Sequence, residues 1–517
     1  MDHHPMKLRM SSSGSMLQTA ILPSSSCMLP HNTHVNKAMT NSLIHELASS
    51  GVLVNTSYFP PTLRICFCPI PIQTMEFNPQ EKQWRLFKFK LQFFSVVPFL
   101  CIHLSSSAVL APILQDPSTR LQFLSLYLRT PYQQPTKLLV DLTAPFSWVE
   151  CTCSNRSSCT YRYHPLPCAS PLCNWLNSPA CSNCSSEPTD PICSDGLCHL
   201  FFARPRNRKR VRVQALADSL ALPVTNGRNP GQLEVVPEFV FSCSERSLLK
   251  GHVPRGVTGL AALGQSKFSL PAQVSNSLSS PNVFALCPSD SPSAPGVAFF
   301  GTRGPYFFLP EIDLSKHLNY TPLLISTDED EAYLIGLTSI RVNGRVAVKL
   351  NRSVLTVDEN GFGGTTLSLS TPYTVLESSI YASLVEAFVN ESAAAAFKLT
   401  ATQPVSPFSV CYDAGDVLVT SAGPAVPTID LVMQSNDVVW RILGSNSMVR
   451  MAREGVDVWC LALLDGGANP PATIVIGGQQ MVDNLLQFDL DSQQLGFSSS
   501  VLVHDTMCAN FNFTVNT

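Results

Sequence analysis

The sequence predicts an all-β protein. Short apolar runs alternate with turn residues through most of the chain after Ala111, and Gly, Pro, Ser and Thr are abundant. Long stretches of Ala, Leu, Glu and Lys at helical period are scarce. This pattern favours many short strands and turns with only a few short helices. A chain of 517 residues has room for two or three domains, at about 100 to 200 residues each.

The charge balance excludes one broad function class. Charged residues make up only 14% of the chain, and the net charge is −3. A nucleic-acid-binding protein normally carries a broad basic surface, so this balance argues against such a partner.

The first part of the chain divides into two segments. Residues 1–84 show no sustained period and are expected to be unstructured or an artefact of the chosen start codon. In residues 85–111, Lys88 and Lys90 precede a short apolar run, and small residues follow it. That order is typical of a secretory signal peptide, which would place the translation start at Met75. The alternative is an apolar strand of a folded domain.

The cysteines indicate an oxidising compartment. Of the eighteen, fourteen follow Cys101, and nine of these fall between Cys151 and Cys198. An even count in a chain with N-glycosylation sequons is typical of disulfides in a secreted glycoprotein. The predicted glycosylation sites are Asn155, Asn183, Asn319, Asn351, Asn390 and Asn512.

The rival interpretation of the cysteine cluster is a zinc site. Cys181 and Cys184 have ligand-like spacing. The neighbouring spacings are irregular and no paired histidine motif accompanies them, so disulfides are favoured and no metal or cofactor is expected.

Elements of the first half follow from apolar patterning. Residues 121–128 alternate at about period two, and residues 138–140 form a strand that leads to Asp141. Residues 239–243 are predicted as a buried strand, residues 256–264 as a glycine-punctuated turn, and a short helix begins at Leu270.

The second half restarts near Tyr320. Strands are predicted at residues 332–337 and 340–348, and residues 381–389 have helical period. Two closing strands are predicted at residues 485–490 and 495–497.

Asp141 is the first candidate catalytic residue. It ends an apolar run and is followed by Ser147, Trp148 and Val149. An aspartic protease needs two such loops, because its two carboxylates share one proton and cannot both ionise a few ångströms apart.

These residues resemble the pepsin-like aspartic protease family over nearly all of residues 112–517. Asp141 with Ser147–Trp148–Val149 is similar to the first active-site loop, and the GLAALG run at 259–264 with Ser269–Leu270–Pro271 is similar to the turn and helix that follow. The resemblance implies two β-lobes, residues 112–312 and 313–517, with a cleft between them.

A narrower resemblance is to the plant branch of extracellular dermal glycoproteins, basic seed globulins and xylanase or endoglucanase inhibitors. It rests on PYTVL (372–376), GSNSMV (444–449), IGGQ (476–479) with DNL (483–485), and CANFNF (508–513). It implies a disulfide-rich insertion in the N-lobe and a bridge between Cys411 and Cys460. Cys153 and Cys159 are extra relative to this branch.

The catalytic loops depart from the family pattern. A working loop reads Asp-Thr-Gly-Ser or Asp-Thr-Gly-Thr, whereas Leu142, Thr143 and Ala144 follow Asp141. The carboxylate is therefore expected to lack its orienting groups. In the second loop Ser368 stands where the second aspartate belongs. A serine cannot share a proton with Asp141, so no intact catalytic pair is expected and both positions are vestigial.

The rest of the sequence offers no clear substitute for the missing catalytic groups. No tyrosine lies between Cys198 and Cys243 to serve as the flap residue, and no histidine lies within thirty residues of Ser368 to act as its base. Asp358 and Glu359 are expected at the far end of a hairpin.

The resemblance therefore implies a secreted, extracellular protein of the apoplast or cell wall that is not an enzyme. Its expected partner is a secreted microbial glycoside hydrolase, a xylanase or xyloglucan endoglucanase, inhibited in plant defence by surface loops placed in its cleft. No membrane contact of the mature form is expected. The alternatives are an active secreted aspartic endopeptidase and a storage or ligand-binding globulin.

Overall fold

The structure is a computed structural model in which the chain forms two compact units, residues 1–105 and 106–517. The described residues are 65–66, 76–78, 83–85, 101–102, 108–129, 135–150, 163–178, 181, 196–203, 210–244, 254–291, 293–324, 332–348, 355–357, 363–434 and 437–515.

In the first unit only short strands are described. β1 (Ile65–Cys66) pairs with β4 (Cys101–Ile102), and β2 (Glu76–Asn78) pairs with β3 (Gln83–Arg85), both antiparallel. These stretches of residues 1–84 are strands, where no structure was expected. Most of the signal-peptide-like segment, residues 85–111, lies outside the described residues.

The second unit begins with β5 (Ala108–Gln115). Val109, Leu110 and Ala111 are fully buried, and the strand pairs with β15 (Gly296–Phe300). Residues 108–111 are therefore part of the folded body, and the expected segment boundary at residue 111 falls too late. Their apolar side chains resemble the small-residue exit of a signal peptide, which is why the sequence pattern included them.

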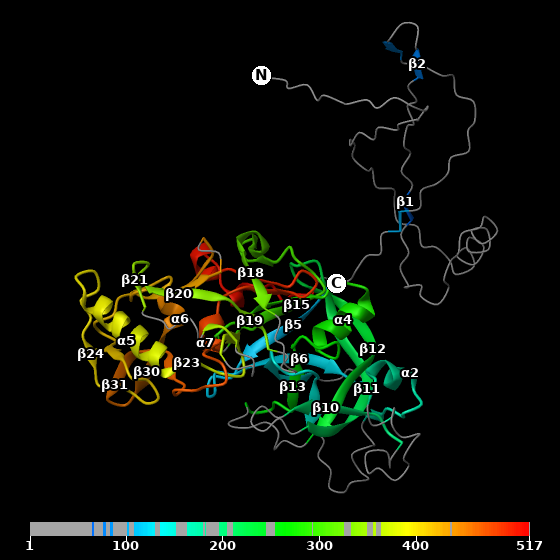
Figure 1. Ribbon diagram of the computed structural model, residues 1–517, viewed down its shortest axis with the longest axis horizontal. Helices are drawn as coiled ribbons and strands as arrows, with labels where there is room; N and C mark the ends of the chain where they lie inside the picture. The colour runs from blue at the N-terminus through cyan, green and yellow to red at the C-terminus, as the bar shows by residue number, and fades with distance from the viewer. Residues whose placement is uncertain are drawn as a thin grey trace, which may run out of the picture. The chain divides into compact units, whose positions relative to one another are not determined.

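A central antiparallel sheet joins the two halves of the second unit (Figure 1). In this sheet the C-terminal hairpin, residues 486–497, pairs with residues 283–286 of the first half. Phe284 stacks there on Phe488 with ring centres 4.6 Å apart. The Cys287–Cys508 disulfide adds a covalent link between the same two regions. The strands lie in the order β18 (Asn319–Leu324), β35 (Gln494–Phe497), β34 (Leu486–Asp489), β14 (Val283–Cys287), β15 and β5.

The first half carries the expected strand before Asp141. Besides the strands of the central sheet, it contains β6 (Gln122–Leu128), β7 (Thr136–Asp141), β8 (Trp148–Glu150), β9 (His164–Pro165), β10 (His199–Ala203), β11 (Arg210–Thr225), β12 (Pro230–Ser244) and β13 (Gly259–Ala262). Helix α4 (Leu270–Leu278) lies against β12, where Gln273 Oε1 accepts from Val240 N at 2.7 Å. The prediction of a turn over residues 256–264 was wrong for residues 259–262, which form strand β13. Gly259 serves close approach instead, because a Cβ there would lie 2.2 Å from the Trp148 carbonyl oxygen.

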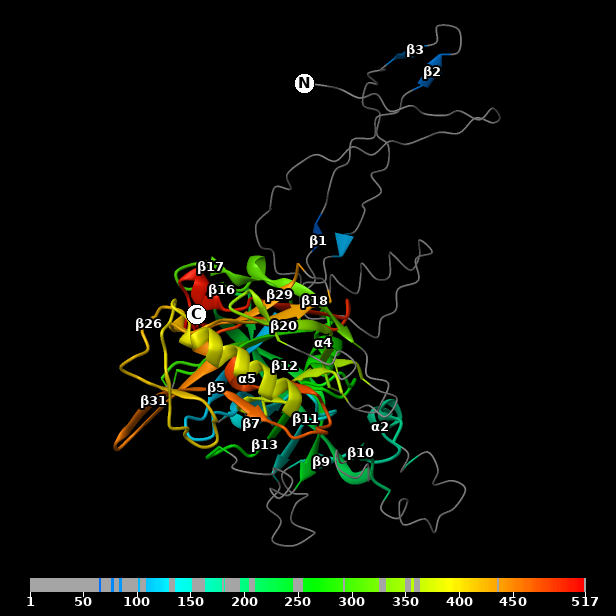
Figure 2. The same ribbon diagram turned by 60° about the vertical axis from the view of Figure 1, so that its left-hand side comes forward.

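The second half holds helix α5 (Ser378–Ala393), which is longer than the predicted 381–389. It begins at Ser378 because the Glu377 carboxylate accepts from the backbone N–H groups of Ser379 and Ile380. Its apolar face buries Ile380, Leu384 and Phe388, and Figure 2 shows it along the outside of the body.

Two small sheets accompany this helix. One contains β20 (Leu337–Val342), β21 (Val346–Ala347), β28 (Ile429–Met433) and β29 (Val439–Ile442); the other contains β24 (Ala401–Thr402), β25 (Cys411–Asp413), β30 (Met448–Arg453) and β31 (Val456–Leu461). Cys411 and Cys460 face each other in the second sheet and are joined by a disulfide. Cys153 and Cys159 lie outside the described residues.

Candidate functional site

Asp141 occupies the end of β7, where its backbone carbonyl accepts from Leu263 N at 2.8 Å. Its carboxylate is partly buried, and Oδ1 accepts two hydrogen bonds from Thr143: from the backbone N–H at 2.8 Å and from the hydroxyl at 2.7 Å. The expectation that this carboxylate lacks orienting groups was therefore wrong. Thr143 supplies them from two residues downstream, a short-range bond that Asp and Thr side chains form readily in turns.

Ser368 directly follows β22 (Thr365–Leu367) and is 8% exposed. Its backbone N–H donates to Ile476 O at 2.9 Å. Its hydroxyl lies 3.1 Å from Ser370 Oγ and 3.0 Å from Thr371 Oγ1. Among the described residues its side chain bonds only to hydroxyls of its own loop, and none of these can act as a base at ordinary pH.

Strand registers place Asp141 and Ser368 at matching points of a duplicated motif. In the first half, Leu139 pairs parallel with Leu260, and Trp148 pairs antiparallel with the same residue. In the second half, Thr366 and Val375 pair in the same two ways with Val475 of β33 (Ile474–Ile476). Two residues beyond Leu139 is Asp141, and two beyond Thr366 is Ser368. Ser368 thus follows its paired strand residue at the same spacing as Asp141 follows its own.

Both loops are supported by a hydrogen bond from a backbone N–H group to a side-chain hydroxyl at the matching position. Ser147 Oγ accepts from Ala262 N at 3.0 Å, and Thr374 Oγ1 accepts from Gly477 N at 3.0 Å. Ser147 and Thr374 are both buried. The scaffold that would hold two catalytic loops is therefore present in both halves, although only one loop carries a carboxylate.

This arrangement cannot form the proton-sharing pair of an aspartic protease. Asp141 and Ser368 offer one carboxylate and one hydroxyl, and a serine hydroxyl cannot take the place of the second carboxylate in sharing a proton. Asp358 and Glu359, the other acids considered, lie outside the described residues. The rings of His317 and His504 lie against each other with centres 3.9 Å apart and are tilted by 35°, and burial lowers the pKa of His504.

Contacts between the two halves lie next to both loops. Arg120, in the turn between β5 and β6, donates from an Nη atom to Gln479 Oε1 at 2.6 Å. Gln479 in turn donates its backbone N–H to Pro372 O, and burial raises the pKa of the adjacent Tyr373. Tyr333 Oη donates to Leu263 O at 2.7 Å. The sequence did not predict these contacts, because each one joins residues that are far apart along the chain.

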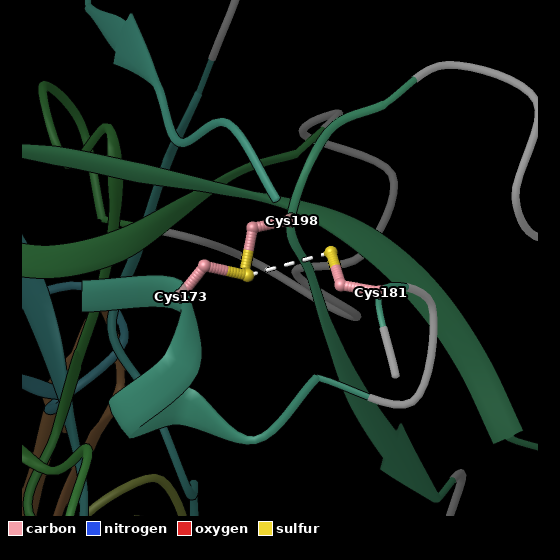
Figure 3. A group of neighbouring side chains, drawn as sticks. All are labelled: Cys173, Cys181 and Cys198. Carbon is pink, nitrogen blue, oxygen red and sulfur yellow. Dashed lines mark hydrogen bonds between the residues drawn. A yellow bond between two sulfur atoms is a disulfide. The ribbon is translucent and has the colours of Figure 1, made fainter. Parts of the chain in front are cut away.

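The cysteine-rich insertion holds disulfides where zinc was the alternative. Cys168 bonds to Cys181, and Cys173, on α2 (Pro171–Leu176), bonds to Cys198. The sulfurs of Cys173, Cys181 and Cys198 gather within 4.8 Å of one another (Figure 3). Zinc binds thiolates, and sulfurs held in disulfides are not thiolates. The dashed 3.4 Å approach between Cys173 and Cys181 joins two bridges, neither of which carries a thiol hydrogen. Cys184 lies outside the described residues.

Asp483 is the described carboxyl group whose pKa lies furthest above its ordinary value. Burial raises its pKa to about 7, against a stabilising hydrogen bond from Cys508 N to its Oδ1 at 2.8 Å. Its backbone N–H donates to Pro288 O, and its carbonyl accepts from Val501 N. It therefore lies where three distant segments meet beside the Cys287–Cys508 bridge.

The predicted glycosylation sites fall in different settings. Asn319 and Asn390 are exposed, the latter on α5. Asn512 is partly buried, and its Oδ1 accepts from the Thr514 hydroxyl at 2.6 Å. Asn155, Asn183 and Asn351 lie outside the described residues. In the described part of the chain no helix is long and apolar enough to cross a membrane.

Comparison with known proteins places the chain in a family. Residues 123–302 match the family described as xylanase inhibitor N-terminal, and residues 332–499 match the one described as xylanase inhibitor C-terminal. The chain belongs to the xylanase inhibitor family. Similar proteins in this family include the probable aspartic proteinase GIP1 of Glycine max, 46% identical over 78% of this chain and 91% of that protein. Gamma conglutin 1 of Prunus dulcis is 39% identical over 77% of this chain and 88% of that protein.

Solved structures agree with this placement in the xylanase inhibitor family. The crystal structure of edgp is 41% identical, with a TM-score of 0.70 over 79% of this chain and 98% of that chain. The structure of basic 7S globulin from soybean is 31% identical, with a TM-score of 0.62 over 78% and 98%. The predicted all-β fold with a few short helices is thus confirmed.

Proposed function

We propose that the protein is a non-proteolytic member of the xylanase inhibitor family that binds and inhibits a glycoside hydrolase, a xylanase or a xyloglucan endoglucanase. The observation that carries the first part is Ser368, at the point in the second loop that matches Asp141 in the first. With a serine at this point, the second loop as described offers Asp141 no carboxylate with which to share a proton.

The inhibitory part rests on family and on physical plausibility. Both matched families are described as xylanase inhibitors. Glycosidases cut with a pair of carboxyl groups in an open cleft, so a protein that places a basic group or loop in that cleft blocks both substrate and catalyst. The disulfides and the sequons support action outside the cell, in the apoplast or cell wall.

A direct assay tests the inhibitory part. The secreted full chain is added at increasing concentration to a panel of fungal xylanases and xyloglucan endoglucanases, and release of reducing sugar is followed. We expect at least one enzyme to be slowed at micromolar or lower concentration. No inhibition of either enzyme class across the panel would contradict the proposal.

The second candidate is an aspartic endopeptidase. It is favoured by the oriented carboxylate of Asp141 and by the Glycine max relative, a probable aspartic proteinase. It requires acid-pH cleavage of a generic protein substrate that pepstatin blocks and Asp141→Asn abolishes. We expect no such cleavage. A storage or ligand-binding globulin, the third candidate, would inhibit no hydrolase.

A further inference from the structure

Trp175 and Lys267 form an exposed pair of an aromatic and a basic side chain on the first half of the second unit. Trp175 lies on α2 and is 38% exposed; Lys267 is exposed in the turn before α4. Both views place α2 at the rim of the folded body (Figures 1 and 2).

The amine of Lys267 is fixed in position by neighbouring groups. Nζ lies 5.1 Å from the centre of the Trp175 ring and 4.9 Å from that of Phe268, and it donates to Trp175 O at 2.9 Å. Phe268 packs against Trp175 with ring centres 5.3 Å apart at 84°. A flexible lysine is therefore held in one place before any partner arrives, which lowers the entropy lost on binding.

The charge of this amine is not neutralised within the described residues. Lys267 makes no ion pair there, whereas Arg303 and Arg441 each bond to aspartates. Contacts with aromatic rings stabilise a cation without removing its charge. An ammonium has three N–H donors, so one bond to Trp175 O leaves two for an external acceptor.

The position of the lysine also bears on what Trp175 can bind. An exposed tryptophan can serve as a stacking surface for a sugar ring, but here Lys267 lies over the indole. The amine offered beside the ring favours a carboxylate with apolar surroundings rather than a neutral sugar.

We propose that Trp175 and Lys267 anchor the glycoside hydrolase, with Lys267 paired to a carboxylate of that enzyme and Trp175 covered by the apolar surface around it. This inference rests on the proposed function and adds a contact surface on the first half of the chain. Tryptophan is enriched among residues that dominate interface affinity, and an ion pair gains importance when the interface removes it from water.

The test uses the full chain and a hydrolase that it inhibits. Binding is measured by surface plasmon resonance at two salt concentrations for the wild type, Trp175→Ala, Lys267→Glu and the control Lys137→Glu. Lys137 is also an exposed lysine over an aromatic ring, with Nζ 5.5 Å from the centre of Phe123. We expect Trp175→Ala and Lys267→Glu each to raise Kd about tenfold or more, and Lys137→Glu to leave it unchanged.

The outcomes separate this inference from the proposed function. If the wild type binds no hydrolase, the proposed function fails. If the wild type binds and both Trp175→Ala and Lys267→Glu bind equally well, the anchor is refuted while the function stands. Lys267→Glu also removes the bond to Trp175 O, so the melting temperature is measured as well, and a loss of affinity with an unchanged melting temperature supports the anchor. Binding of soluble xylan that Trp175→Ala abolishes and Lys267→Glu retains would overturn it in favour of sugar stacking.

Discussion

Replacing Asp483 by Asn should stabilise the protein at neutral pH and leave it unchanged in acid. Asp483 adopts a left-handed conformation with φ of 49°, which Asn tolerates well. The amide oxygen of Asn can still accept from Cys508 N, as Oδ1 of Asp483 does at 2.8 Å. The variant therefore removes the titratable proton and preserves the contacts.

The sign and size of the effect follow from the raised pKa of Asp483, about 7 against an ordinary 3.8. Between these values the folded protein holds a proton that the unfolded chain has lost. Stability from this group is therefore fully present below pH 3.8 and is lost as the pH rises through about 7. Each pKa unit is worth about 1.4 kcal/mol, so the ceiling is about 4 kcal/mol. The side chain is not fully enclosed, which lowers our expectation to about 1–3 kcal/mol.

The assay is urea unfolding at a series of pH values from 4 to 8, followed by tryptophan fluorescence. We expect the advantage of Asp483→Asn over the wild type to be near zero at pH 4 and to grow towards pH 8. Asp505→Asn is the matched control, because Asp505 also has a positive φ, of 54°, and is exposed. An advantage of Asp483→Asn that is the same at every pH, or absent at pH 8, would refute the reasoning.

Two further perturbations have expected outcomes. Arg441→Ala should lower the free energy of unfolding by about 2–4 kcal/mol, because it strands Asp430, whose side chain is only 4% exposed and accepts two bonds from Arg441; Arg450→Ala, which breaks an exposed pair, should change little. Thr374→Val should cost more than Ser147→Ala in chemical denaturation, because Thr374 also bonds to a buried glutamine; each should cost about 1–3 kcal/mol, and equal costs would contradict the reasoning.

Local patterns predicted much of the architecture. The strand before Asp141 and the helices beginning near Leu270 and in residues 381–389 are present, because apolar periodicity is decided by which face is buried. The apolar pattern failed where the role of a residue depends on contacts with a distant part of the chain. Gly259 looks like a turn glycine in sequence, yet it lies in a strand because the Trp148 backbone passes too close for a side chain.

The candidate site was predictable in its residues and not in its bonds. The spacing of the sequence predicted the position of Ser368, and the registers give it the same spacing from its paired strand as Asp141 has in the first half. The hydrogen bonds from Thr143 to Asp141 depend on the conformation of the loop. They were not predicted because this loop departs from the family motif, which says nothing about a threonine at that position. Lys267 and Trp175 are 92 residues apart, and no local pattern could bring them together.

The pairing of β14 with β34 has a consequence for how the chain is made. The edge of β14 that pairs with β34 reads VFALC and is fully buried in the finished sheet. During synthesis that apolar edge stays open until β34 has emerged, and open apolar edges attract wrong partners. Cys287 likewise waits for Cys508, 221 positions later. Neither half completes this sheet without the other, so the edge of β14 must be protected from wrong partners until β34 pairs with it.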